Sequence, residues 1–149
     1  MNIGITNDHR GLQVKQFLTE YLENLGYNVI DYGTDSEEPA DFPDYAKKLG
    51  LGIISNEVDL GIAICGTGIG MSIALNKMKN VYCAKVSSTA EASLSRAHNN
   101  ANVIALPGRF INVSQAVVIL RSWLATEFMG GRHSERVQMI ADIEKENMK

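Results

Sequence analysis

The sequence has few cysteines, no long hydrophobic run and no excess of positive charge, and each absence excludes a class of protein. Its two cysteines, Cys65 and Cys83, form no Cys-x-x-Cys pair and have no histidine at ligand spacing, which argues against a zinc site or a disulfide framework. No run of about 18 apolar residues occurs, so no membrane-spanning helix is expected. Residues 1–6 lead directly into a strand pattern and show no basic region followed by a long apolar stretch, the pattern of an export signal. We therefore predict a cytoplasmic protein. Its thiols are expected to be free.

The charge balance limits the partners of the chain. The net charge is −3, from 14 basic and 17 acidic side chains, so no overall positive field would hold a nucleic-acid backbone or an acidic membrane surface. We therefore expect no nucleic acid and no membrane as a partner, and any anion site must be local. A chain of 149 residues, 45% of them hydrophobic, fits one domain over residues 1–149 that buries roughly 70% of its unfolded surface.

Short apolar runs alternate with amphipathic stretches along the chain. The apolar runs predict strands at 2–6, 28–31, 60–65, 81–86 and 102–106. Helical periodicity covers 11–25, 45–55, 71–78, 89–98 and 114–128. This alternation predicts an α/β fold, a single doubly wound (Rossmann-like) sheet of five parallel strands.

Two further signals concern the helices. Ser88 with Glu91 has the spacing of a capping box, and either Asn112 or Ser114 is suited to cap the following helix. A polar stretch over 133–147 predicts an extra C-terminal helix with no strand after it. It would either lie over the domain or reach a second subunit, and both alternatives stay open.

Polar residues follow the predicted strands directly. They are Asp8 and His9, the loop 65–70, Ser87 and Ser88, and Gly108 and Arg109. Because the carboxyl ends of parallel strands meet at one edge, where such folds bind ligands, we expect these residues to lie together.

The loop over residues 65–70 has the sequence Cys-Gly-Thr-Gly-Ile-Gly, whose glycines let backbone amides point at an anion. Its third glycine comes too early for a dinucleotide fingerprint, it lacks the lysine of a P-loop, and Met71 stands where a cysteine phosphatase has arginine. A thiolate at a helix start is a base or a nucleophile. A strand cysteine is otherwise a small packed hydrophobe, but the flanking glycines favour chemistry for Cys65, whereas Cys83 keeps the structural interpretation.

Three other groups have both a chemical and a structural interpretation. His98, at the carboxyl end of a helix and near the crevice edge, either transfers protons or faces water as a cap. Asp8 and His9 favour a site, although Asp8 is also suited to cap the first helix. Arg132 and Arg136 share one face at the start of the last helix, which either an anionic ligand or an ordinary solvated surface explains.

Four segments together resemble the ribose-5-phosphate isomerase B family. They are NDHRG at 7–11, ICGTGIG at 64–70, SRAHNNANV at 95–103 and GGRHSERV at 130–137. The resemblance covers nearly the whole chain and implies an aldose-ketose isomerase acting on ribose 5-phosphate and ribulose 5-phosphate. Related isomerases act on galactose or allose 6-phosphate, so a six-carbon substrate is one alternative, and a non-catalytic sugar-phosphate sensor is another.

The resemblance also implies roles for individual residues. Cys65 would be the base that moves a proton between C2 and C1 through a cis-enediolate, Thr67 would orient the sugar, and His98 with Asp8 would open the furanose ring. The other implied contacts are the oxyanion-site residues Gly66, Gly68, Ile69 and Gly70, the sugar ligand Asn99, and the phosphate ligands His9, Arg109, Arg132 and Arg136. No metal or organic cofactor is implied.

The family builds its active sites across a dimer interface, with the ring-opening histidine and the arginines facing the loop of the other subunit. A homodimer with shared sites, or a tetramer of two such dimers, is therefore expected. Three residues depart from the pattern of the ribose enzymes: Asn7 and Arg10 replace small residues, and Asn100 stands where aspartate is common. Arg10 would either add a phosphate contact or narrow the sugar pocket.

Overall fold

Five short strands form one sheet in which every neighbouring pair is parallel. The computed structural model describes residues 1–148. The strands are β1 (Asn2–Asn7), β2 (Asn28–Asp31), β3 (Leu60–Cys65), β4 (Cys83–Lys85) and β5 (Val103–Pro107). Their order is β2-β1-β3-β5-β4, so the direction in which strands are added reverses between β1 and β3. A ligand crevice in such a sheet lies at the carboxyl ends of the two strands at this switch point.

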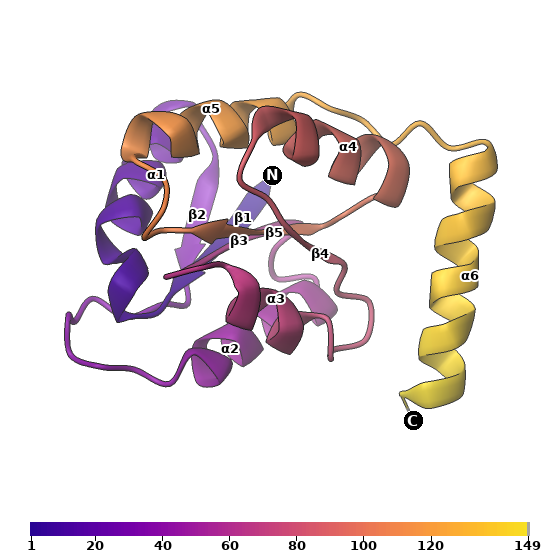
Figure 1. Ribbon diagram of the computed structural model, residues 1–149, viewed down its shortest axis with the longest axis horizontal. Helices are drawn as coiled ribbons and strands as arrows, with labels where there is room; N and C mark the ends of the chain where they lie inside the picture. The colour runs from indigo at the N-terminus through magenta and orange to yellow at the C-terminus, as the bar shows by residue number, and fades with distance from the viewer. Residues whose placement is uncertain (149) are drawn as a thin grey trace.

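Helices cover both faces of the sheet (Figure 1). They are α1 (Leu12–Asn24), α2 (Phe42–Ile54), α3 (Ile69–Leu75), α4 (Thr89–Asn99) and α5 (Val113–Leu124), with a 3₁₀ turn, η1, at His9–Gly11. Helices α1, α4 and α5 pack on one face, and α2 and α3 pack on the other. The predicted fold, a doubly wound α/β domain, is confirmed.

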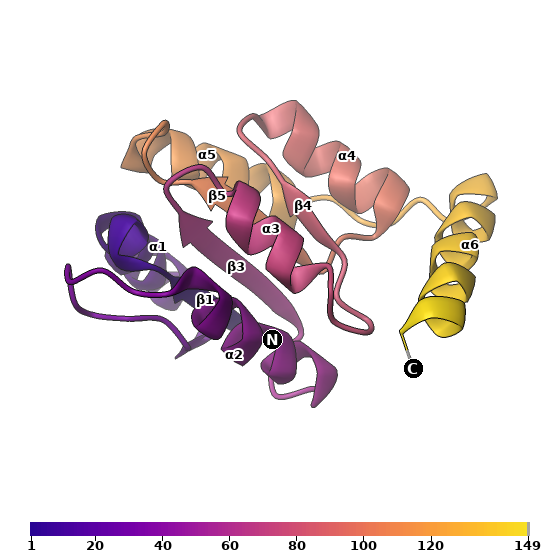
Figure 2. The ribbon, with the colours of Figure 1, turned by 60° about the horizontal axis from the view of Figure 1, so that its bottom comes forward.

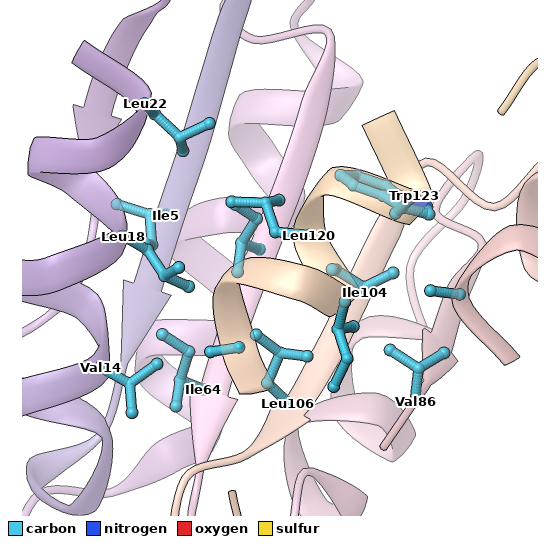
Figure 3. Close-up of a cluster of buried hydrophobic side chains, with 14 of the residues drawn as sticks. Ile5, Val14, Leu18, Leu22, Ile64, Val86, Ile104, Leu106, Leu120 and Trp123 are labelled. Atoms are coloured by element: carbon cyan, nitrogen blue, oxygen red, sulfur yellow. The ribbon is translucent and has the colours of Figure 1, made fainter. Parts of the chain in front are cut away.

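The strands divide their side chains between two apolar cores. Because successive residues of a strand point to opposite faces, Ile62 and Ile64 lie under α1 and α5, whereas Ala63 and Cys65 lie under α2 and α3. Figure 3 shows the first core, in which Trp123 of α5 packs over the central strands. This alternation places the Cys65 side chain on the α2–α3 side of the sheet.

Several boundaries differ from the sequence prediction for local reasons. Helix α2 begins at Phe42 rather than residue 45 because Pro43 fits the first turn, where its missing N–H costs no hydrogen bond. Strand β4 is shorter than predicted because only residues 83–85 pair with β5, at the edge of the sheet. Of the two candidate caps for α5, the N-cap is Asn112 rather than Ser114. It forms a reciprocal capping box with Gln115. Ser88 accepts a hydrogen bond from the amide of Glu91, as predicted.

The helix α6 (Arg132–Asn147) stands beside the domain rather than over the sheet (Figures 1 and 2). The segment before it is tied to α4 where the amide of Met129 donates to the carbonyl of Ala97, at 3.0 Å. Its far end is tied where Glu144 accepts from the amide of Asn80, at 3.0 Å. Between these ties, Met139 and Ile143 are at least 60% exposed. The predicted extra C-terminal helix is confirmed.

Within residues 1–148, no helix combines the length and apolar character needed to cross a bilayer.

Candidate active site

A cavity of about 220 Å³ lies at the carboxyl ends of β1 and β3. Its walls come from three chain segments that follow β1, β3 and β5, and from the start of α2. The lining residues are Asp8, Arg10, Phe42, Cys65, Gly66, Thr67, Gly70 and Arg109. The topology thus brings Asp8, the loop after Cys65 and Arg109 together, as the sequence predicts, whereas the cavity lining does not include His9, Ser87, Ser88 or Gly108. Phe42 was not among the predicted site residues, because an aromatic at a helix start has no pattern that marks it.

Backbone hydrogen bonds extend the sheet pairing into the loops around this cavity. The amide of Gly108 donates to the carbonyl of Cys65 at 2.8 Å, and the amide of Arg109 donates to that of Gly66 at 3.0 Å. On the other side, the amide of Asp8 donates to the carbonyl of Ile64 at 3.1 Å. Backbone hydrogen bonds that continue those between the strands therefore hold the three loops together. They fix the position of the backbone around the cavity.

The Cys65 side chain is 5% exposed, and its sulfur accepts a hydrogen bond from the amide of Gly68 at 3.2 Å. Gly68 has φ +77°, a left-handed conformation that favours glycine. A Cβ there would also lie 3.2 Å from the carbonyl oxygen of Ala105. The Thr67 hydroxyl accepts from the amide of Ile69 at 3.1 Å, which fixes its orientation at the pocket.

Asp8 and His9 are oriented by backbone contacts. One oxygen of Asp8 accepts from the amide of Arg10 at 2.9 Å, so this carboxylate caps η1 while it also lines the cavity. Nδ1 of His9 accepts from the amide of Ala40 at 3.1 Å. A neutral His9 must therefore carry its proton on Nε2, which makes Nε2 a hydrogen-bond donor.

The segment that orients His9 is held by a buried lysine that the sequence analysis missed. Lys15 is 2% exposed, and its ammonium contacts Asp31 at 3.0 Å, Asp35 at 2.7 Å and the carbonyl of Thr34 at 2.8 Å. Asn7 binds the same segment, since its side-chain oxygen accepts from the amide of Thr34 at 3.1 Å. The available signal was a lysine adjacent to the buried stripe of α1.

The structure does not bring His98 to this cavity. Helix α4 runs back across the sheet, so its last turn lies near the amino ends of the strands, where the amide of Gly61 bonds the carbonyl of Asn102 at 2.8 Å. Cys65 lies at the carboxyl end of β3, on the opposite edge. The expectation that His98 lies near the crevice edge is wrong within one chain. A helix that connects parallel strands runs antiparallel to them, and this direction sets the position of its last turn.

His98 instead packs against the start of α6. Its ring stacks on that of His133, with centroids 4.3 Å apart and planes 11° apart. Arg132 and Arg136 lie on the same turns of α6. Asn99 lines a neighbouring cavity of about 300 Å³ together with residues of β4 and α6. We call His98, Asn99, Arg132, His133 and Arg136 the α4–α6 cluster.

Burial lowers the pKa of His133, and positive charge on His98, Arg132 and Arg136 lowers this pKa further. In the unfolded chain the pKa of this histidine has its ordinary value of 6.5. As the pH falls below about 6.5, the unfolded chain therefore binds more protons than the folded chain. We expect the free energy of unfolding to decrease with falling pH in this window. His133→Phe, which keeps a flat ring but cannot be protonated, should reduce the slope in denaturant titrations between pH 7 and pH 5. An unchanged slope would show that His133 does not titrate as described.

No group of three or more histidine, cysteine, aspartate and glutamate side chains within residues 1–148 is arranged to hold a metal ion. The cavity is lined by a thiol, backbone amides, a hydroxyl, a carboxylate and guanidinium groups. It is suited to bind an anionic small molecule and to move a proton on it.

The chain is a doubly wound α/β domain with a thiol and a glycine loop at its switch point, the position at which such folds bind small molecules. Residues 3–140 match the Ribose/Galactose Isomerase family. The chain belongs to this family, and the resemblance predicted from its motifs is confirmed.

Relatives in this family agree with the chain over nearly its whole length. Ribose-5-phosphate isomerase B of Escherichia coli is 42% identical over 138 residues, which cover 93% of each protein. The structure of the Clostridium thermocellum ribose-5-phosphate isomerase B has a TM-score of 0.96 at 44% identity, covering 98% of this chain and 99% of that one. The Mycoplasma genitalium enzyme, with bound ribulose-5-phosphate, has a TM-score of 0.94 at 41% identity, covering 98% and 97%.

Proposed function

We propose that this chain interconverts ribose 5-phosphate and ribulose 5-phosphate, with Cys65 as the base. The observation that carries this proposal is the Cys65 sulfur, which lies at the ligand cavity and faces the amide of Gly68. The similarity to ribose-5-phosphate isomerase B proteins, one of them with bound ribulose-5-phosphate, supports the choice of substrate. A six-carbon sugar phosphate remains the alternative within the same family.

In the proposed reaction, the Cys65 thiolate removes the proton from C2 of the open-chain aldose. The electrons move to the C1 carbonyl oxygen, which gives a cis-enediolate. The amides from Gly66 to Gly70 stabilise the negative oxygen, and the Thr67 hydroxyl holds the sugar in place. The thiol then returns the proton to C1, while the hydroxyl proton of C2 moves to the C1 oxygen and leaves a ketone at C2.

Ring opening and phosphate binding use the other groups. His98 donates a proton to the ring oxygen while Asp8 accepts the proton of the C1 hydroxyl, and Asn99 binds a sugar oxygen. The phosphate is bound by Nε2–H of His9 and by guanidinium groups. Each guanidinium group is planar and can donate two parallel N–H bonds to two oxygens of one phosphate. These guanidinium groups belong to Arg109, Arg132 and Arg136.

We further propose that the complete site is shared between two copies of the chain. Cys65 and the α4–α6 cluster lie at opposite edges of one sheet, so a cluster can serve a Cys65 cavity only from another copy. The exposed apolar side chains of α6, Met139 and Ile143 among them, supply a surface for this contact. A homodimer is the smallest assembly with this geometry.

The substrate is tested by comparing kcat/KM for ribose 5-phosphate, allose 6-phosphate and galactose 6-phosphate. We expect a preference for ribose 5-phosphate of at least about 100-fold, because binding energy from the correct sugar is used in the transition state. In deuterium oxide, the recovered substrate should also carry deuterium at C2. A higher kcat/KM for a six-carbon substrate would change the assignment within the family. Binding without deuterium exchange on any of the three sugars would favour the non-catalytic sensor.

A further inference from the structure

Arg10 is a lining residue of the Cys65 cavity to which the proposed reaction gives no role. It lies in η1, where its amide is bonded to Asp8 at 2.9 Å. The side chain extends over the glycine loop: a Cβ built on Gly66 would lie 3.1 Å from Cδ of Arg10. The stem is therefore directed along the cavity wall, next to the backbone that leads from Cys65.

The charge in this cavity is not balanced. Arg10 and Arg109 both line it, and within residues 1–148 neither side chain forms an ion pair or donates a hydrogen bond. The carboxylate of Asp8 lines the same cavity but directs one oxygen to the backbone of η1. Two unpaired guanidinium groups at one cavity repel each other, and a doubly charged anion between them would remove that repulsion.

The adjacent histidine points to the same kind of ligand. Because Nδ1 of His9 accepts from Ala40, its Nε2–H is a donor, and it lies directly before Arg10 in the chain. Asp8 and Arg10 line the end of the cavity nearest β1, and His9 lies between them in the chain with its Nδ1 bonded to Ala40. A steric role for Arg10, in which it only narrows the sugar pocket, would not explain why a second unpaired cation stands beside Arg109.

From this geometry we infer that Arg10 is a specificity-determining residue that binds the phosphate of the substrate from the same subunit as Cys65. The inference rests on the proposed function only for the identity of the sugar. It assigns to this chain a phosphate contact additional to His9 and the arginines named above. The pocket thereby selects phosphorylated over unphosphorylated sugars without depending on α6 alone.

The test compares Arg10→Gln, which keeps a polar side chain of similar reach without the charge, with Arg121→Gln on the distant helix α5 as the matched control. Binding of inorganic phosphate is measured by calorimetry at constant ionic strength, and kcat and KM are measured with ribose 5-phosphate. We expect Arg10→Gln to weaken phosphate binding and raise KM by about 10- to 30-fold, with kcat within about twofold. Arg10→Lys should recover part of the loss, and Arg121→Gln should change neither value.

Unchanged phosphate affinity in Arg10→Gln would overturn the inference, whatever the activity. So would an equal loss of kcat/KM for ribose 5-phosphate and for unphosphorylated ribose, because a phosphate contact affects only the first. Arg10→Gly adds a second check, since a purely steric role predicts a gain with six-carbon sugars and no loss of phosphate binding. A wild-type protein that binds phosphate through Arg10 but isomerises no pentose phosphate would refute the proposed function and leave this inference standing.

Discussion

Cys65→Ser is expected to lower kcat by about 1,000-fold or more, with the affinity for phosphate esters within about threefold of wild type. Serine has nearly the size of cysteine and can still accept from the amide of Gly68, so the loop should keep its shape. A hydroxyl is far more weakly acidic than a thiol, however, and it cannot take the C2 proton near neutral pH. The loss should therefore appear in kcat, because the base acts in the chemical step and not in binding.

The measurement is steady-state isomerisation of ribose 5-phosphate, together with wash-in of solvent deuterium at C2. Cys83→Ser is the matched control, since burial raises the pKa of Cys83 to about 12 and keeps it a thiol in a packed position. The control should retain activity within about threefold, although it is expected to lose some stability. Undiminished turnover and deuterium exchange in Cys65→Ser would place the base elsewhere in the cavity.

The parts of the molecule that sequence analysis predicted well depend on local patterns. Strands β1, β3 and β5 are nearly continuous apolar runs because both of their faces are buried, and this makes them visible without a structure. The loop after Cys65 was placed at the ligand edge by a general property of parallel sheets. These inferences needed only the order of elements along the chain and the direction of each strand.

The parts that were missed depend on contacts between distant segments. The stack of His98 on His133 joins two helices, and neither sequence neighbourhood indicates which ring faces the other. Lys15 is buried because Asp31 at the end of β2 and Asp35 in the following segment both contact its ammonium group, a compensation that the pattern of α1 does not reveal. Similarly, α6 has few contacts with the sheet, so no periodicity could place it.

The separation of Cys65 from His98 leads to the second large expected effect. In a shared site, each cavity combines Cys65 of one copy with the α4–α6 cluster of the other. Homodimers of Cys65→Ser and homodimers of His98→Asn should each be nearly inactive. A mixed dimer of the two variants has one cavity with both lesions and one with none. It should therefore recover about half of the wild-type activity per dimer, because one of its two symmetric sites is intact.

Mixed dimers can be isolated by coexpressing the two variants with different affinity tags and purifying on both. The matched control pairs His98→Asn with a chain that carries Arg132→Gln and Arg136→Gln. All of these changes lie in the α4–α6 cluster, so each cavity of this mixed dimer meets one damaged cluster and no activity should return. Recovery in the first pair and none in the second would distinguish a site shared across the interface from general stabilisation of one subunit by another. If the first pair also stays inactive, both residues act within one chain, and α4 would have to move far from the position described above.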